Sequence, residues 1–226
     1  MKTFAIITAA GSGSRFSSGK NETPKQFIKL NGKPVILYSL EVFQKSRLID
    51  EIFISANYKY FDLLHSMAVK NKITKLTTLV EGGKTRFNSV KNAFLRINSK
   101  PGDLILIHDA ARPNITKKFI EELLTSALKF GEVVPGLKIS ETVKKEKKGI
   151  ITGTVDRNNL WTVQTPQVFR YEVLKKSYLK AGRKNYFTDE SALAENAGFK
   201  VRIIKGSRDN IKITTEEDLR ILKKIF

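Results

Sequence analysis

The stretch TFAIITAAGSGSRFSSGKNETPK, residues 3–25, decides how the rest of the chain is read. Its first part, Thr3–Thr8, is apolar and predicts a buried strand. The small residues of Ala9–Ser14 follow and predict a loop, because glycine and serine clusters interrupt regular structure. Cations come next along the chain. A strand followed by a glycine loop and cations predicts a phosphate-binding site.

Two residue types make this loop suitable for phosphate. Gly11 and Gly13 let backbone N–H groups approach an anion closely, and Arg15 and Lys25 supply positive charge. The loop is neither a dinucleotide fingerprint, which needs a small residue where Phe16 stands, nor a P-loop, whose spacing it lacks. The alternative is a plain strand-to-helix turn with incidental cations.

The composition limits the kinds of site that the chain can build. The 226 residues are enough for one large α/β domain or two small ones. There are no cysteines and only two histidines, His65 and His108. Disulfides, thiolate metal sites and histidine-rich metal sites are therefore excluded, so a metal would be held by oxygen ligands, which favours Mg²⁺.

The charge of the chain predicts anionic partners. Lysine and arginine number 41 against 22 aspartates and glutamates, a net charge of +19. Such a balance favours nucleotides, sugar phosphates or nucleic acid. We expect no membrane span and no signal peptide, since the N-terminal apolar run stops at Ala10. A cytoplasmic protein is therefore expected.

Apolar runs of strand and helix type alternate over the first 130 residues. We expect strands at Ile52–Ala56, Leu76–Val80, Leu104–His108 and Val133–Leu137, with helices at Val35–Lys45, Lys59–Lys70, Thr85–Ile97 and from about Thr116. This order predicts an α/β fold with a Rossmann-like, doubly wound and mostly parallel sheet. Ligands bind at the carboxyl ends of the strands in such sheets.

Three segments lie at those strand ends: Ala9–Arg15, Glu81–Arg86 and His108–Pro113. In the third, Asp109 follows a buried strand and could reach Mg²⁺ or a ribose hydroxyl. The alternative is that Asp109 caps the helix near Thr116 and pairs with Arg112. We expect His108 to pack in the core.

The pattern changes after Val133. A lysine-rich turn near Gly149 joins two β segments, which predicts a polar ribbon at about residues 138–160. This ribbon is either a solvated hairpin or an arm that embraces a partner, and we keep residues 1–226 as a single domain with this arm. Further on we expect helices at Tyr171–Ala181, Thr188–Asn196 (capped by Thr188) and Glu216–Ile225, and strands at Val201–Lys205 and Ile211–Thr214.

Seven segments in this order resemble the sugar-phosphate cytidylyltransferases, and among them those that act on 2-C-methyl-D-erythritol 4-phosphate in non-mevalonate isoprenoid biosynthesis. The segments are AAGSGSR (9–15), PKQF (24–27), GGKTRFNSV (82–90), HDAARP (108–113), VDRNNLWTVQTPQVF (155–169), TDESAL (188–193) and DNIKIT (209–214). The resemblance covers nearly the whole chain. It implies a nucleotidyltransferase that uses CTP and a divalent cation such as Mg²⁺, and a homodimer joined through the β arm.

The resemblance also implies roles for individual residues. Arg15, Lys25 and Lys212 match the catalytic cations around the reacting phosphates. The CTP site is matched by Ala9, Ala10, Gly11, Gly13, Gly82, Gly83, Ser89 and Asp109. The pocket for the polyol phosphate is matched by Arg112, Thr142, Arg157 and Thr165, some of them from the partner's arm. Asp109 and Asp209 match metal-side positions.

Two other functions remain open at this stage. A cytidylyltransferase for ribitol 5-phosphate would share the CTP loops and differ only in the second pocket. A basic nucleic-acid-binding protein would explain the charge, but the chain has no nucleic-acid recognition motif and no aromatic-rich basic stretch. No specific nucleic acid is therefore expected as a partner.

Overall fold

The computed structural model describes residues 1–11, 23–182 and 187–226. The predictions for Gly13, Arg15 and the basic residues up to 22 lie outside the described residues. Within the described ranges, an eight-stranded sheet has the order β10-β7-β11-β6-β1-β4-β5, with β12 also paired to β7. Its strands are β1 (Thr3–Ala9), β4 (Glu51–Ala56), β5 (Leu76–Glu81), β6 (Leu104–Asp109), β7 (Val133–Lys138), β10 (Trp161–Val163), β11 (Gln167–Arg170) and β12 (Arg202–Lys205).

The sheet is mostly parallel, as the sequence predicts. Strand β1 pairs in parallel with both β4 and β6, while β10 and β11 run antiparallel to their neighbours. Because β4 and β6 lie on opposite sides of β1, the chain reverses its winding direction at β1. This is the kind of point at which open α/β sheets form a ligand crevice.

Strand β1 is apolar throughout because both faces of the sheet are covered. Ala5 and Ile7 point into one core, and Phe4 and Ile6 point into the other. A continuous apolar run is what a strand buried on two faces requires. The prediction of a buried first strand is therefore confirmed.

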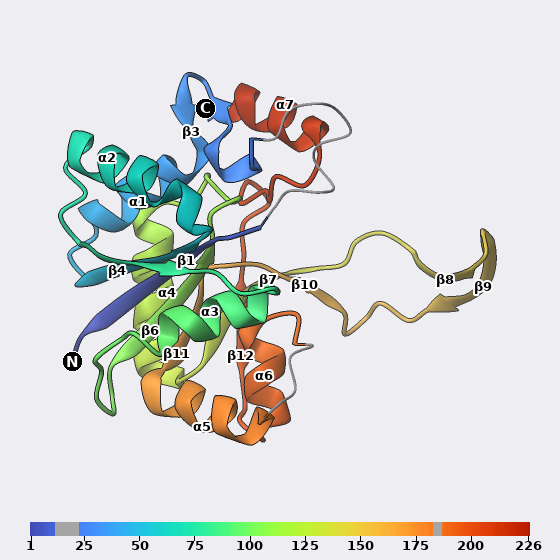
Figure 1. The fold of residues 1–226 in the computed structure, drawn as a ribbon. Coiled ribbons are helices and arrows are strands. Elements are labelled where there is room, and N and C mark those ends of the chain that lie inside the picture. Colours follow the sequence, from blue (N-terminus) through green and yellow to red (C-terminus); the bar gives the residue numbers. More distant parts are fainter. Residues whose placement is uncertain (12–22, 183–186) are drawn as a thin grey trace.

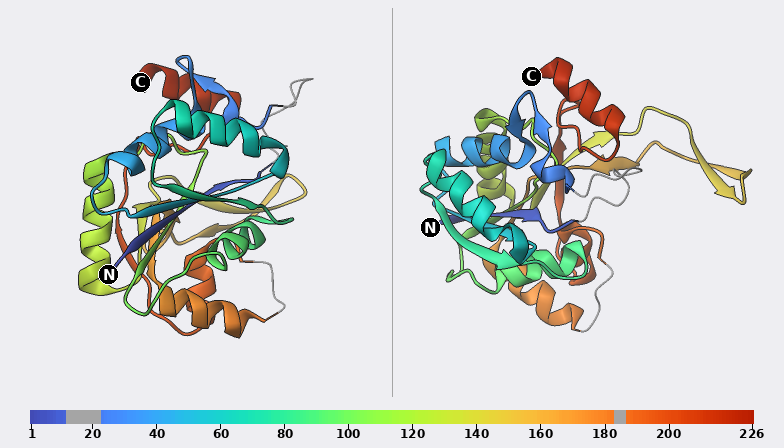
Figure 2. Two further views of the ribbon diagram at one scale, coloured as in Figure 1. Left: turned by 60° about the vertical axis from the view of Figure 1, so that its left-hand side comes forward. Right: turned by 45° about the horizontal axis from the view of Figure 1, so that its top comes forward.

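Helices form a layer on each face of the sheet (Figures 1 and 2). One layer contains α1 (Val35–Lys45), α2 (Phe61–Lys70) and α4 (Lys117–Phe130), and the other contains α3 (Arg86–Phe94), α5 (Tyr171–Ala181) and α6 (Glu190–Asn196). A small third core joins the hairpin of β2 (Lys29–Leu30) and β3 (Lys33–Pro34) to α7 (Glu216–Ile225) through Leu30 and Leu222.

The predicted bounds of α1, α5 and α7 agree with the structure, but three other predictions are corrected. Helix α6 is capped by Asp189, whose side chain accepts from the Ala192 amide, and not by Thr188. The predicted strand Ile211–Thr214 is irregular. Helix α3 ends at Phe94, three residues before the predicted end.

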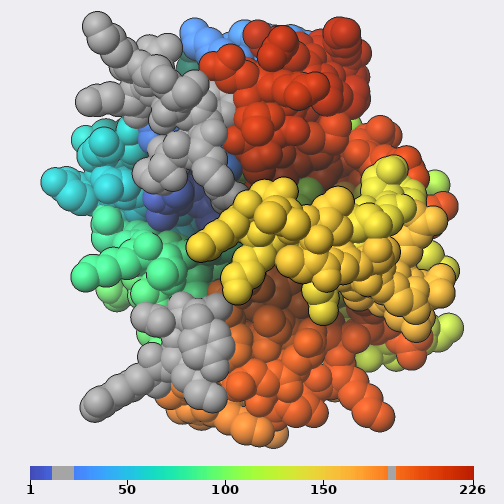
Figure 3. All heavy atoms as spheres, turned by 90° about the vertical axis from the view of Figure 1, so that its right-hand side faces the viewer, coloured from blue at the N-terminus to red at the C-terminus, as the bar shows by residue number. Residues whose placement is uncertain are grey.

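The lysine-rich ribbon is a hairpin that projects from the body of the molecule. Strands β8 (Val143–Lys147) and β9 (Ile150–Val155) pair with each other in a separate two-stranded sheet. Figure 1 shows this arm extending away from the helices and the main sheet, and Figure 3 looks at the face from which it projects. Near its turn, Ile150 and Ile151 are 69% and 63% exposed. In the part of the chain that the structure describes, no helix is both long and apolar enough to cross a membrane.

Candidate active site

A cavity of about 460 Å³ opens at the carboxyl ends of β1, β5 and β6. Residues from several loops converge on it, and the described lining residues are Thr8, Ala10, Gly11, Lys25, Gln26, Gly83, Lys84, Thr85, Arg86, Ser89, Asp109, Ala110, Ala111 and Lys212. Four of these carry positive charge and one carries negative charge. This balance suits a polyanion better than a neutral ligand.

Asp109 lies at the centre of the charged lining. One of its carboxylate oxygens, Oδ1, accepts from Arg86 Nε at 2.9 Å and from Thr8 Oγ1 at 3.2 Å. The other, Oδ2, accepts from Lys212 Nζ at 2.6 Å. The alternative that Asp109 caps α4 and pairs with Arg112 is wrong, since the α4 cap is Thr116 and Arg112 donates to the Asn210 carbonyl.

The two cations keep Asp109 ionised. Burial alone would raise the pKa of its carboxyl group, but Arg86 and Lys212 outweigh burial and hold that pKa well below its usual range. Arg86 in turn lies between two carboxylates, because its Nη1 donates to both oxygens of Glu190 at 3.1 and 2.8 Å. Burial lowers the pKa of Arg86, and Glu190 and Asp109 together raise it above its ordinary value.

His108 lies behind this cluster and does not reach the cavity. It is fully buried, and Nε2 is 3.2 Å from Ser39 Oγ and 3.0 Å from the Arg112 carbonyl oxygen. Burial lowers the pKa of His108 to about 4, so its ring is neutral at physiological pH. The expectation that His108 packs in the core is confirmed.

Close backbone packing shapes the end of the cavity where the loop after β5 meets the loop after β1. A Cβ atom on Gly82 would lie 2.2 Å from the Ala10 Cβ, so only glycine allows the loop after β5 to approach the loop after β1. The Gly83 amide donates to Ser89 Oγ at 3.1 Å. Ser89 also donates to the Thr85 carbonyl oxygen at 2.9 Å, which ties the start of α3 to this loop.

The segment after the glycine loop supplies a clamp that sequence reasoning missed. Gln26 is buried in a short 3-10 helix, Lys25–Phe27, and its Nε2 donates to the carbonyl oxygens of Ala9 and Gly11 at 2.5 and 3.2 Å. Lys25, one residue earlier, lines the cavity as predicted. The side-chain amide thereby fixes the exit of β1 against the segment that carries Lys25.

Two residues predicted for the polyol phosphate, Arg112 and Thr165, lie beside the cavity and not in its lining. Thr165 is buried, accepts from the Asp109 amide at 3.1 Å, and has its hydroxyl 3.2 Å from His108 Nδ1. It therefore supports the backbone at Asp109. The buried Nε of Arg112 has no partner among the described residues, which leaves a donor that could serve an anion.

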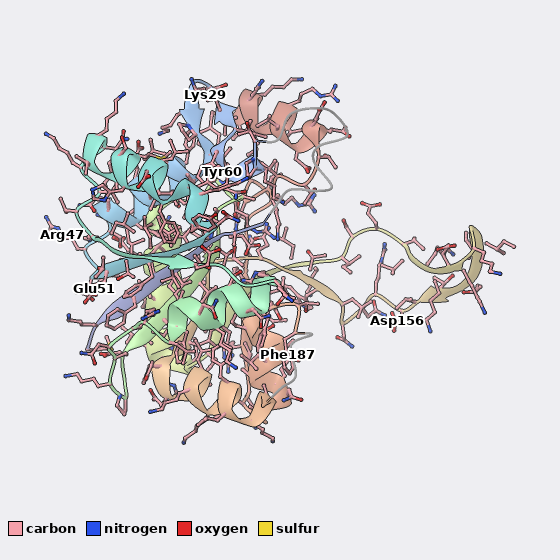
Figure 4. All side chains as sticks on the ribbon, in the orientation of Figure 1. Lys29, Arg47, Glu51, Tyr60, Asp156 and Phe187 are labelled. Atoms are coloured by element: carbon pink, nitrogen blue, oxygen red, sulfur yellow. The ribbon has the colours of Figure 1, made fainter. Side chains whose placement is uncertain are left out.

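The other two residues predicted for that pocket, Thr142 and Arg157, lie on the arm or at its base. Both are exposed, and Arg157 Nη1 donates to the Ser140 carbonyl. In Figure 4 the neighbouring Asp156 stands well outside the body of the molecule. The structure therefore does not bring Thr142 and Arg157 to the cavity of their own chain.

The two residues predicted to lie beside a metal, Asp109 and Asp209, border different cavities. Asp209 is exposed and lines a cavity of about 410 Å³ next to the start of α4. No three His, Cys, Asp or Glu side chains gather into a metal cluster in residues 1–11, 23–182 and 187–226. The donors at the first cavity fit an ion held mostly by nucleotide phosphates, with Asp109 as one protein carboxylate; this is a common arrangement for Mg²⁺.

Arg86 and Glu190 are two further site residues that the sequence analysis did not single out. Both stand in quoted segments, GGKTRFNSV and TDESAL, but 104 positions separate them in sequence. A signal existed: an acid predicted at a buried strand end needs a cation, and Arg86 closes the segment that follows another strand of the sheet, β5. Lys84 of the lining was also missed.

Comparisons with known proteins agree with this geometry. A family model described as 2-C-methyl-D-erythritol 4-phosphate cytidylyltransferase (IspD) matches residues 3–226. The chain is 40% identical over 225 residues to the protein of that name from Caldicellulosiruptor bescii, covering 100% of this chain and 97% of the relative. It is 37% identical over 220 residues to the one from Lysinibacillus sphaericus, covering 97% and 93%.

Solved structures give the same result. The crystal structure of the Francisella tularensis 2-C-methyl-D-erythritol 4-phosphate cytidylyltransferase superposes with a TM-score of 0.82 at 32% identity, covering 100% of both chains. The enzyme of that name from Thermus thermophilus gives a TM-score of 0.80 at 26% identity, covering 100% of this chain and 98% of the other. The chain belongs to the 2-C-methyl-D-erythritol 4-phosphate cytidylyltransferase family.

Proposed function

We propose that the protein transfers CMP from CTP to 2-C-methyl-D-erythritol 4-phosphate, giving 4-diphosphocytidyl-2-C-methyl-D-erythritol and pyrophosphate. The full-length family match supports this proposal. The observation that carries it is the cavity at the strand ends, with Lys25, Lys84, Arg86 and Lys212 on its wall and Asp109 among them.

The reaction needs no general base. A phosphate oxygen of the methylerythritol substrate attacks the α-phosphorus of CTP, and the bond from that phosphorus to the bridging oxygen breaks, so pyrophosphate leaves with its electron pair. The attacking oxygen is already anionic at neutral pH. Consistent with this, the neutral His108 is sealed in the core.

The protein's task is then to bring two polyanions together and to stabilise the charge that develops on the α-phosphate. Positioning and electrostatic stabilisation supply this in phosphoryl-transfer enzymes. We assign it to Lys25 and Lys212, together with Arg15, which lies outside the described residues. Asp109 orients Lys212 through the 2.6 Å contact and faces the nucleotide. Gly82, Gly83 and Ser89 are proposed to hold the cytosine.

A divalent cation, with Mg²⁺ as the expected ion, is proposed to enter with the triphosphate. When bound, it neutralises phosphate charge. Asp109 would hold it from the protein side, since a carboxylate oxygen can accept more than one partner and its contacts to Arg86 and Lys212 can be shared. For Asp209 the metal role remains a prediction.

We also propose a homodimer in which the arm of one subunit reaches the site of the other. Thr142 and Arg157 match residues of the polyol-phosphate pocket, yet both are exposed and neither lines the cavity of their own chain. Asp156, next to Arg157, lies on the arm outside the body of the molecule (Figure 4). The exposed Ile150 and Ile151 give the arm an apolar surface suited to burial against a second copy.

Pyrophosphate release tests the activity. The purified protein is given CTP and Mg²⁺ with either 2-C-methyl-D-erythritol 4-phosphate or ribitol 5-phosphate. Turnover with the first substrate and not the second is the expected result. Turnover with ribitol 5-phosphate alone would keep the CTP site and overturn the second pocket, and no release with either would reject the proposed reaction.

A further inference from the structure

The ion-pair chain Glu190–Arg86–Asp109 connects the cavity to a residue that does not line it. Arg86 is the first residue of α3 and Glu190 the first residue of α6. Arg86 borders the cavity, whereas the Glu190 side chain is only 1% exposed and lies behind Arg86. Among the described residues, Arg86 is therefore the side chain that links Glu190 to the cavity.

The orientation of Arg86 depends on its two carboxylate partners. Its Nε is held by Asp109 and its Nη1 by Glu190, while its buried Nη2 makes no hydrogen bond to any described residue. Removing Glu190 would leave Asp109 as the only hydrogen-bond partner that the described structure gives this guanidinium. A long side chain held at a single point has many more rotamers open to it.

Fold stability alone does not account for this pair. A buried ion pair contributes little net stability, because taking both charges out of water costs about as much as their attraction returns. An apolar contact between α3 and α6 would serve packing equally well, and Phe87 and Leu193 already contribute to the core that both helices share. What an ion pair adds is a fixed direction for the guanidinium.

The direction of the Arg86 guanidinium determines how the Asp109 carboxylate is held. Its carboxylate is shared between Arg86 on Oδ1 and Lys212 on Oδ2. If Arg86 is released, Lys212 becomes the remaining cation on Asp109 and the carboxylate can rotate toward it. The Asp109 carboxylate would then no longer hold a hydrogen-bond acceptor in a fixed direction toward the nucleotide.

We propose that Glu190 is a positioning residue of the nucleotide subsite, holding Arg86 so that Arg86 fixes the Asp109 carboxylate for CTP. This inference rests on the proposed function, since it assumes that the cavity binds CTP. Glu190 itself touches no substrate.

The test is CTP binding by calorimetry with Mg²⁺ present and no second substrate, which reports affinity and binding stoichiometry separately. Glu190→Gln is expected to raise the Kd for CTP about tenfold, the scale of losing a supporting side chain behind a ligand site, with stoichiometry unchanged. Glu190→Asp, which keeps the charge but is too short, is expected to shift Kd in the same direction. The Arg86→Lys, Glu190→Gln double variant is expected to bind no more weakly than Arg86→Lys alone, because Glu190 acts through Arg86.

The chain offers a matched control in Glu132, whose side chain is 4% exposed and pairs with Arg170 Nε at 2.9 Å, outside the cavity lining. Glu132→Gln is expected to leave the Kd for CTP unchanged. The positioning role is overturned if the Glu190 variants bind CTP with the wild-type Kd. It is also overturned if these variants show only a lower binding stoichiometry or a lower thermal stability, as a structural defect would cause. Failure of the wild-type protein itself to bind CTP would reject the proposed function instead.

Discussion

At the scale of a single residue, replacing Lys25 tests whether its charge contributes to catalysis. Lys25→Ala removes one preorganised cation from the cavity wall, so kcat/KM for CTP is expected to fall about 10²–10³-fold. Steady-state pyrophosphate release measures this. Lys29→Ala, an exposed lysine close by in sequence, is the control and is expected to retain full activity. A loss of less than about fivefold in Lys25→Ala would remove Lys25 from the catalytic assignment.

The pH dependence of the reaction follows from individual pKa values. Asp109 has a lowered pKa and stays ionised, and burial lowers the pKa of His108 to about 4, so that it stays neutral above about pH 5. Neither group therefore titrates near neutrality. We expect kcat/KM for the methylerythritol substrate to fall below about pH 6, where its phosphate dianion takes up a proton and becomes a monoanion.

A pH series of initial rates at saturating CTP and Mg²⁺ measures this profile. His65→Gln, which changes the exposed histidine, is expected to leave the profile unaltered. An acid limb that moves or disappears in this variant would show that a histidine controls the rate.

At the same scale, individual residues show what the sequence could predict of the site. Lys25 and Asp109 could be predicted because they follow the ends of recognisable strands, whereas Lys212 and Ser89 were expected from the family resemblance. The structure places all four at one cavity. The ion pair between Arg86 and Glu190 could not be predicted, because it depends on how α3 and α6 pack beside each other on the same face of the sheet. Periodicity shows which face of a helix is buried but not which helices are neighbours.

At the scale of an element, α7 is stabilised by a capping box. Thr215 Oγ1 accepts from the Asp218 amide, and the Asp218 carboxylate accepts from the amides of Thr214 and Thr215, both at 2.8 Å. Burial would raise the pKa of Asp218, but hydrogen bonds from the Thr214 hydroxyl, at 2.6 Å, and from these two amides outweigh burial and lower that pKa. The contribution of the carboxylate is therefore present above its unfolded pKa of about 3.9 and is lost as pH falls through the folded value.

Asp218→Ala is accordingly expected to lower the free energy of unfolding by about 1 kcal/mol at pH 7. The difference from wild type should shrink as pH falls below about 4. Urea unfolding at a series of pH values measures both effects. Glu217→Ala removes an exposed acid from the same turn and is expected to cost less. An Asp218 effect independent of pH would contradict the role of its charge.

Elements also show where prediction from sequence failed. Helices α1, α5 and α7 have strong apolar periodicity and clear ends, and their bounds were predicted correctly. The stretch from Trp161 to Arg170 contains two strands, β10 and β11, that pair in the main sheet. Short apolar segments carry too little periodic signal to distinguish a strand from a buried loop.

At the scale of the whole molecule, mixed dimers test whether the arm serves a second subunit. Arg157→Ala changes the arm and Lys25→Ala changes the cavity, and each variant alone is expected to be impaired. If the arm completes the partner's site, co-expressing both variants creates one intact site in each mixed dimer. About one quarter of all sites then become active under random pairing.

Activity per subunit of the co-expressed mixture, relative to each variant alone, measures the recovery. If Arg157 acts within its own chain, every site keeps a defect and mixing restores nothing. A monomer of full activity in solution would reject the shared site directly.

The position of β11 in the sheet also has a consequence for the synthesis of the protein. Residues 167–170 form the strand that lies between β6 and β7, although β6 and β7 come earlier in the chain. Until β11 leaves the ribosome, the sheet cannot close, and β6 and β7 each present an unpaired edge. Unpaired edges of buried strands invite pairing with other chains. The nascent chain therefore depends on protection from aggregation until β11 has emerged and joined β6 to β7.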